Sequence, residues 1–163
     1  MLTPLEIALF AALGLIFAAG LIVVARWSGR NLPHLAGYAL IAACFIYVGL
    51  GLGSDNPNSW SAVEMTVVAV FGSLAFLPRL TSVWVLVAAL LIHPVWLIYV
   101  HYRGSAALFT PAPLVVANAS FDAALALYLA FLALRGQPAP IMQPTSKGRK
   151  GSPREPGACR PGP

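Results

Sequence analysis

Long apolar stretches alternate with short polar connections along the first 135 residues of the chain. A helix needs about 20 apolar residues to cross ~30 Å of hydrocarbon, and five stretches meet or approach that length. The predicted spans cover residues 5–25, 34–52, 61–77, 80–100 and 114–134. The pattern therefore predicts an all-α protein, an integral membrane bundle of five transmembrane helices (residues 1–135) with a disordered C-terminal tail (residues 136–163).

Two of the stretches leave an alternative open. The first lies where a signal peptide would lie, but Glu6 and no Lys or Arg precede its core, and its apolar run is longer than that of a signal peptide. We interpret it as a retained span. The third contains Glu64 one turn from its start and ends at Pro78. Without this third span, a four-span arrangement would place both ends of the chain on the same side.

The basic residues divide the polar connections into two groups. Of the ten Lys and Arg residues, nine follow the first, third or fifth span, and Arg103 alone falls on the other side. The nine are Arg26, Arg30, Arg79, Arg135, Lys147, Arg149, Lys150, Arg154 and Arg160. Because basic residues are enriched in cytoplasmic loops, we predict a multi-pass protein of the cell (plasma) membrane, with its N-terminus outside and its C-terminus in the cytoplasm.

The composition agrees with a chain embedded in lipid. Hydrophobic residues make up 59% and charged residues 9%, with a mean hydropathy of +0.80, whereas soluble domains contain about 25% charged residues. The net charge of +5 does not indicate a nucleic acid partner, because the bases lie in short loops and the tail without interleaved aromatic residues. The lipid bilayer is the partner that the sequence predicts.

Residues 136–163 differ from the rest of the chain in composition. They contain seven of the 14 prolines together with five glycines and five basic residues. Such a segment buries too little apolar area to offset the entropy of ordering, so we predict a disordered cytoplasmic tail. Its bases either contact anionic lipid or simply help to orient the spans. Cys159 lies in this tail and Cys44 in an apolar stretch, so we do not expect a disulfide between them.

Four ionisable residues lie inside the predicted spans, at similar depth in their outer halves: Glu64, His93, His101 and Asp122. At 1.5 Å per residue, His93 lies ~12 Å below His101, level with Asp122 on the fifth span. Asn118 shares a helix face with Asp122, and Tyr47 lies at comparable depth. Because a charge in the bilayer costs about 2.5–3.5 kcal/mol, such residues usually face the bundle interior. We therefore predict a polar intramembrane pocket that opens outward.

The fourth span carries Pro94 directly after His93. Proline removes a backbone donor and crowds the carbonyl four residues earlier, so we predict a kink at this point. Eight residues separate the two histidines, and regular α-helical geometry turns their side chains about 80° apart. A single site that includes both requires that the kink bring them together. On the second span, Gly49 with Gly53 and Ala39 with Ala43 are small pairs that favour close helix approach.

Three interpretations of the ionisable residues remain open. In the first, His93 with Asp122 and His101 with Glu64 form interhelical pairs that only hold the bundle together. In the second, the residues bind a small solute, an ion or a lipid headgroup, or exchange a proton, since an imidazole and a carboxylate together can exchange a proton near neutral pH. In the third, the two imidazoles and two carboxylates hold a divalent metal such as zinc or non-haem iron.

Other chemistries are excluded by the residue types present. No span contains a Lys for a retinal Schiff base, and His34 lies too far from His93 for a bis-histidine haem. No nucleophile elbow or Ser-His-Asp order is visible in the sequence. Five spans without inverted repeats do not form a complete transporter, although a homo-oligomer or a partner in a membrane complex could provide a pathway.

The spans also resemble a family of small multi-pass bacterial membrane proteins of unknown function. The resemblance rests on a Gly-rich helix end at 49–53, Glu64, the segment His93-Pro-Val-Trp96, His101, the prolines of the following loop and Asp122. It covers residues 35–134, and departs where the family has an acidic residue at Leu97 and a Trp at Val63. The resemblance implies which residues matter but no activity. We favour a non-enzymatic protein, with a metal-dependent membrane enzyme or a subunit of a membrane complex as the alternative.

Overall fold

The computed structural model describes residues 2–77 and 82–136, which form helices and connecting turns without any strand. The elements are α1 (Pro4–Trp27), α2 (Leu32–Leu52), α3 (Pro57–Phe76), α4 (Val83–Trp96), a π-helix (Leu97–Tyr102) that continues α4, a 3-10 helix (Ser105–Leu108), and α5 (Ala112–Leu134). The predicted all-α bundle of five helices is confirmed. Each helix, α4 taken with its π-helical end, has at least 20 residues and an apolar composition, enough to cross ~30 Å of hydrocarbon. The predicted tail beyond Gly136 lies outside the described residues.

Local signals set where the helices begin and end. Thr3 and Glu6 form a capping box at the start of α1, with the backbone N–H of Thr3 donating to Oε2 of Glu6 at 2.7 Å. Pro57 occupies the first turn of α3, where a missing N–H costs nothing, and so α3 begins before the predicted start at residue 61. The hydroxyl of Ser82 caps α4, which therefore begins at Val83 and not at residue 80.

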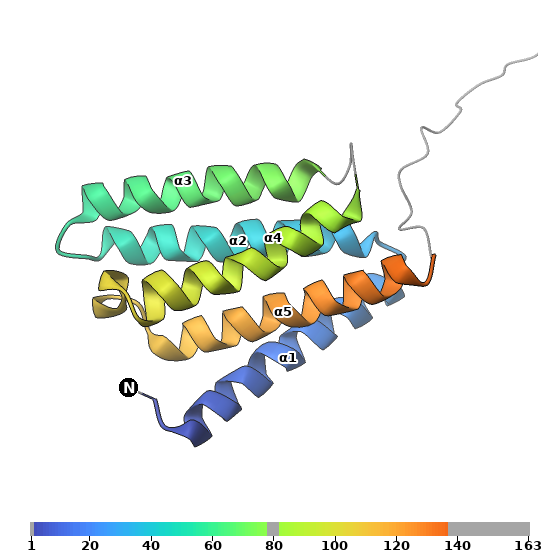
Figure 1. Ribbon diagram of the computed structural model, residues 1–163, viewed down its shortest axis with the longest axis horizontal. Coiled ribbons are helices and arrows are strands. Elements are labelled where there is room, and N and C mark those ends of the chain that lie inside the picture. Colours follow the sequence, from blue (N-terminus) through green and yellow to red (C-terminus); the bar gives the residue numbers. More distant parts are fainter. Residues whose placement is uncertain (1, 78–81, 137–163) are drawn as a thin grey trace, which may run out of the picture.

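The five helices lie side by side and cross the bundle in alternating directions (Figure 1). The N-terminus lies at one end of the bundle and the last described residues of α5 lie at the other (Figure 1). Arg26 lies in the last turn of α1, and Arg30 and Arg135 follow α1 and α5, which finish at that second end. Arg103 follows the π-helix at the first end. Arg79 lies outside the described residues. Five long helices thus place the two ends of the helical region on opposite sides, as an odd number of spans requires.

Close helix approaches occur at glycines other than those predicted. A Cβ atom on Gly14 of α1 would lie 2.1 Å from the carbonyl oxygen of Ala117 on α5. Gly37 of α2 similarly approaches the backbone of Ala75 on α3. In contrast, a Cβ on Gly49 would meet nothing within 4 Å, and one on Gly53 would meet only its own helix end. Gly49 and Gly53 therefore do not provide the close helix approach that their spacing favours, at least among the described residues.

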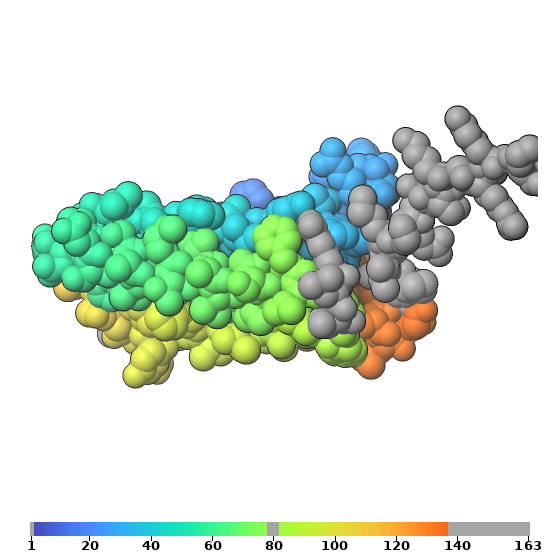
Figure 2. All heavy atoms as spheres, turned by 90° about the horizontal axis from the view of Figure 1, so that it is seen from above, coloured from blue at the N-terminus to red at the C-terminus, as the bar shows by residue number. Residues whose placement is uncertain are grey.

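The core of the bundle is apolar in the half that lies toward Arg26 and Arg135. Its buried residues come from all five helices and include Ala18, Leu40, Phe71, Leu90 and Leu129. Large apolar side chains also cover the outside, as in Ile16 of α1, which is 66% exposed. In the view of Figure 2, α3 covers the near face between α2 and α4. Such an apolar exterior is stable when lipid, and not water, surrounds it.

Candidate functional site

Near the middle of the bundle, a thiol, an imidazole and a carboxylate from three helices lie in a row. Nδ1 of His93 on α4 lies 2.6 Å from Oδ2 of Asp122 on α5. The other ring nitrogen of His93, Nε2, lies 3.6 Å from Sγ of Cys44 on α2. The ring of Phe71 on α3 packs edge-on against the imidazole, with 4.9 Å between the ring centroids. Four helices thus hold the His93 ring in one orientation.

A second row lies toward the end of the bundle that carries Arg103. Nε2 of His101 lies 3.1 Å from Oε1 of Glu64 on α3, which is within ion-pair distance. Nδ1 of His101 lies 3.0 Å from the hydroxyl of Thr110, which precedes α5. The angles between His101 and Glu64 do not satisfy hydrogen-bond geometry, so we describe this contact as an ion pair and not as a hydrogen bond.

The π-helix explains how both histidines face the interior. Over Leu97–Tyr102 the chain bonds one residue further back than an α-helix does, as in the bond from Arg103 N–H to the Ile98 carbonyl. A π-turn accommodates one extra residue, so the eight steps from His93 to His101 turn about as far as seven α-helical steps. Seven steps amount to roughly 700°, which leaves the side chains only ~20° apart. The predicted separation of about 80° is thus corrected.

Tyr47 and Asn118 lie between the two rows. The Asn118 amide donates to the Tyr47 hydroxyl at 3.4 Å, and the Tyr47 ring packs against His101 with 4.5 Å between centroids. Asn118 precedes Asp122 by one helical turn on α5, so it links the two levels along one helix face. All six residues predicted from the sequence therefore lie in one buried polar region that extends from the middle of the bundle toward its Arg103 end.

The geometry of this region differs from an open pocket. The side chains form two separate pairs, and Glu64, His93, His101 and Asp122 each have at most 1% of their surface exposed. Among the residues that the structure describes, the neighbouring side chains therefore shield these four from solvent. The four residues also do not converge on one point: among residues 2–77 and 82–136, no three His, Cys, Asp or Glu side chains are grouped closely enough to hold a metal ion. The described residues therefore do not provide the set of ligands that the metal interpretation requires.

Two residues of the region were missed in the sequence. Cys44 lies three residues before Tyr47 and so shares its helix face, a spacing that could have indicated a common environment. Thr110 lies in the connection before α5, and no local pattern indicates that it reaches His101.

Several buried polar atoms of this region have no hydrogen-bond partner, among them Oδ1 of Asp122 and Nε1 of Trp96. Buried polar atoms without a hydrogen-bond partner are uncommon in folded proteins, and each needs a physical explanation.

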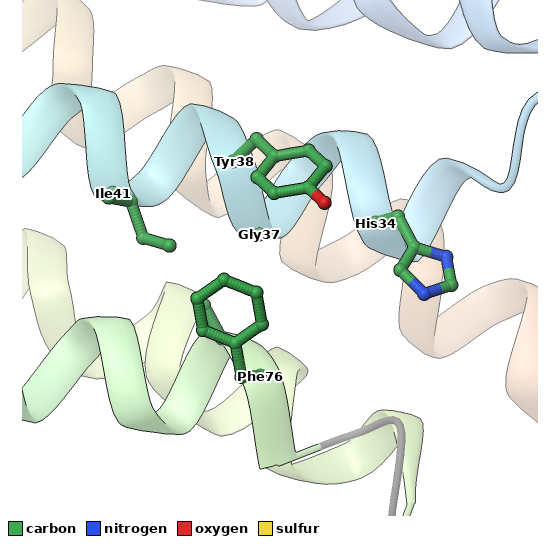
Figure 3. Close-up of a pocket in the computed structure, with 6 residues that line it drawn as sticks. His34, Gly37, Tyr38, Ile41 and Phe76 are labelled. Atoms are coloured by element: carbon green, nitrogen blue, oxygen red, sulfur yellow. The ribbon is translucent and has the colours of Figure 1, made fainter.

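A shallow groove lies elsewhere, between α2 and α3 near the opposite end of the bundle (Figure 3). The Tyr38 and Phe76 side chains face each other across it, with 6.3 Å between ring centroids. Its lining is otherwise largely apolar, and none of the residues of the buried polar region contributes to it. We therefore place the candidate site in the polar region and not in this groove.

No protein-family model, no curated protein and no solved structure matches the chain. The resemblance to a family of small bacterial membrane proteins stays a prediction, carried by Glu64, His93, His101 and Asp122. What the site can do must therefore be argued from its geometry.

Proposed function

We propose that this chain is a multi-pass plasma-membrane protein that binds protons in its two buried imidazole–carboxylate pairs. Each pair consists of an imidazole and a carboxylate, two groups that titrate in different ranges when alone and whose proton binding is coupled when they are in contact. The observation that carries the proposal is the contact between Nδ1 of His93 and Oδ2 of Asp122, both buried inside apolar spans. The proposal makes the proton the ligand of the polar region predicted from the sequence.

The energetics of the membrane interior support a role in proton binding. A lone charge near the bilayer centre costs about 2.5–3.5 kcal/mol, and this cost is reduced when an opposite charge lies in contact. An added proton changes the net charge of a pair that lipid and apolar side chains surround. Proton binding is therefore coupled strongly to packing around His93 and His101, which gives the site a means of responding to pH.

The position of the pairs supports exchange with one side of the membrane. The His101–Glu64 pair lies toward the Arg103 end, and Tyr47 and Asn118 connect its level to that of Asp122. In the opposite half, the buried side chains of the described helices are apolar. Protons therefore exchange through the polar half. By the distribution of basic residues, we propose that this half faces the outside and that the N-terminus lies there too.

Nitrogen-15 NMR of the histidine rings in lipid nanodiscs tests this function directly. Three histidines are present, and His34 at the start of α2 serves as an internal reference far from both pairs. The spectra are recorded from about pH 5 to pH 8, and we expect the His93 and His101 signals to change with pH because each ring lies in contact with a carboxylate. We also expect E64Q to change the titration of His101 while the titration of His34 stays the same.

The opposite result has a clear meaning. If His93 and His101 each keep one protonation state across that range while His34 titrates, the pairs do not bind protons reversibly. The short contact between His93 and Asp122 would then serve only to join α4 and α5, as the first interpretation of the sequence holds.

A further inference from the structure

The row Cys44–His93–Asp122 has the arrangement of a nucleophile, a general base and an orienting carboxylate. Nε2 of His93 lies 3.6 Å from the thiol sulfur, and Nδ1 lies 2.6 Å from the carboxylate. The two ring nitrogens thus face the same two kinds of partner as in hydrolytic triads, where Nε2 faces the nucleophile and Nδ1 the carboxylate. The residues come from α2, α4 and α5 and are not close in the sequence.

We propose that Cys44 is a covalent modification site, whose thiol adds to an apolar α,β-unsaturated carbonyl compound dissolved in the lipid, with His93 as its base and Asp122 as a positioning residue. The addition uses the His93–Asp122 pair of the proton-binding proposal, but it needs only a transient proton transfer from Cys44 to His93 and no proton from the aqueous phase. It concerns only the row Cys44–His93–Asp122, and it gives a role to Cys44, which has none in the proton-binding proposal.

The location of the thiol determines the class of substrate. Cys44 belongs to the apolar core, together with Leu40, Phe71 and Leu90, and lies near the middle of α2. A thioester on a polar carrier would hold its carbonyl near the headgroups, far from this sulfur. An enal, an enone or a quinone carries its reactive carbon into hydrocarbon without a charged group. Phe45 is 50% exposed next to Cys44, so the lipid boundary lies within one helical turn of the thiol.

The addition balances without a further reactant. The S–H proton passes to Nε2 of His93 as the sulfur forms a bond to the β-carbon. The electron pair of the carbon–carbon double bond moves toward the carbonyl oxygen, which gives an enolate. His93 then returns the proton to the α-carbon, and the product is a thioether on Cys44. No group leaves, and no electrons are supplied from outside.

Asp122 acts through His93 and not on the substrate. When its carboxylate is ionised, Nδ1 of His93 donates its proton to Oδ2, and the lone pair of Nε2 then faces Sγ of Cys44. An amide in place of the carboxylate of such a triad leaves the geometry intact but favours the wrong tautomer. D122N should therefore slow the addition and should also change the nitrogen-15 signals of the His93 ring.

The test measures covalent modification of the full chain in lipid nanodiscs by N-ethylmaleimide, a membrane-permeant α,β-unsaturated carbonyl compound. The sequence contains two cysteines, so the C159S variant leaves Cys44 as the sole thiol. Mass spectrometry follows the rate. We expect an adduct on Cys44 that forms at least ~10-fold more slowly in H93Q and in D122N, since a positioned base contributes about 10²–10⁴.

A matched control separates reactivity from access. Cys44 is 1% exposed, whereas F45C in a C44A/C159S background places a thiol on the adjacent lipid-facing position. H93Q should leave the rate at F45C unchanged. The proposal is overturned if Cys44 forms no adduct, or if its rate stays equal or rises in H93Q or D122N. Either result leaves the proton titration of the histidines unaffected as a separate test.

Discussion

Substitution of Gly14 by alanine tests the tightest helix contact in the bundle. Gly14 lies on α1 where it crosses α5, and a Cβ atom there would lie 2.1 Å from both the carbonyl oxygen of Ala117 and the hydroxyl oxygen of Ser120. The Ser120 side chain can rotate away. The Ala117 carbonyl cannot, because it belongs to the α5 backbone, so the two helices must separate for the methyl group to fit.

The structure also sets the size of the effect. An ordinary contact begins at 3.4 Å, so the helices must shift until the 2.1 Å separation grows to that value. Overpacking of this kind costs about 1–3 kcal/mol. Alanine has a greater helix propensity than glycine, which offsets up to ~1 kcal/mol of this cost. We therefore expect G14A to lower the free energy of unfolding by roughly 1–2 kcal/mol, since the clash with a backbone atom outweighs the gain in propensity.

The assay is reversible unfolding in mixed micelles, with helicity followed by circular dichroism. Gly20 provides the control, because it lies on the same helix and a Cβ atom there would meet nothing within 4 Å. G20A should be neutral or slightly stabilising. If G14A is as stable as G20A, the close crossing of α1 and α5 described for Gly14 is wrong.

Two other predictions concern the buried pair and the topology. H93L and D122L should each destabilise the bundle by about 3 kcal/mol, because each leaves a buried partner alone. In H93L/D122L the loss of unfolding free energy should be smaller than the sum of the two single losses by at least about 1 kcal/mol. If the losses are additive in the same unfolding assay, the two side chains do not stabilise the bundle through their contact with each other. Labels at the N-terminus and the C-terminus should be accessible from opposite sides of sealed vesicles, and protection of both from the same side would contradict five spans.

Much of the fold is predictable from the sequence because the membrane imposes a local rule. Each span must satisfy its own backbone hydrogen bonds, so an apolar stretch of sufficient length becomes a helix whatever its neighbours do. The five spans therefore needed no knowledge of packing. The same rule made Glu64, His93, His101 and Asp122 conspicuous, since an ionisable residue in such a stretch needs a partner from another helix.

The tertiary structure decided how these residues meet. Regular helix geometry separated His93 from His101, and the π-helix after Pro94 brought them to one face. Cys44 belongs to the first row through its contact with His93, 49 positions away in the sequence. Thr110 belongs to the second row through its contact with His101, nine positions away. The spacing of Cys44 from Tyr47 indicates a shared helix face, but no local pattern gives the partners of Cys44 and Thr110, because a contact between helices depends on where the small residues let the backbones approach. The hydrocarbon environment therefore determines each helix separately, whereas the packing between helices determines which side chains form the polar region.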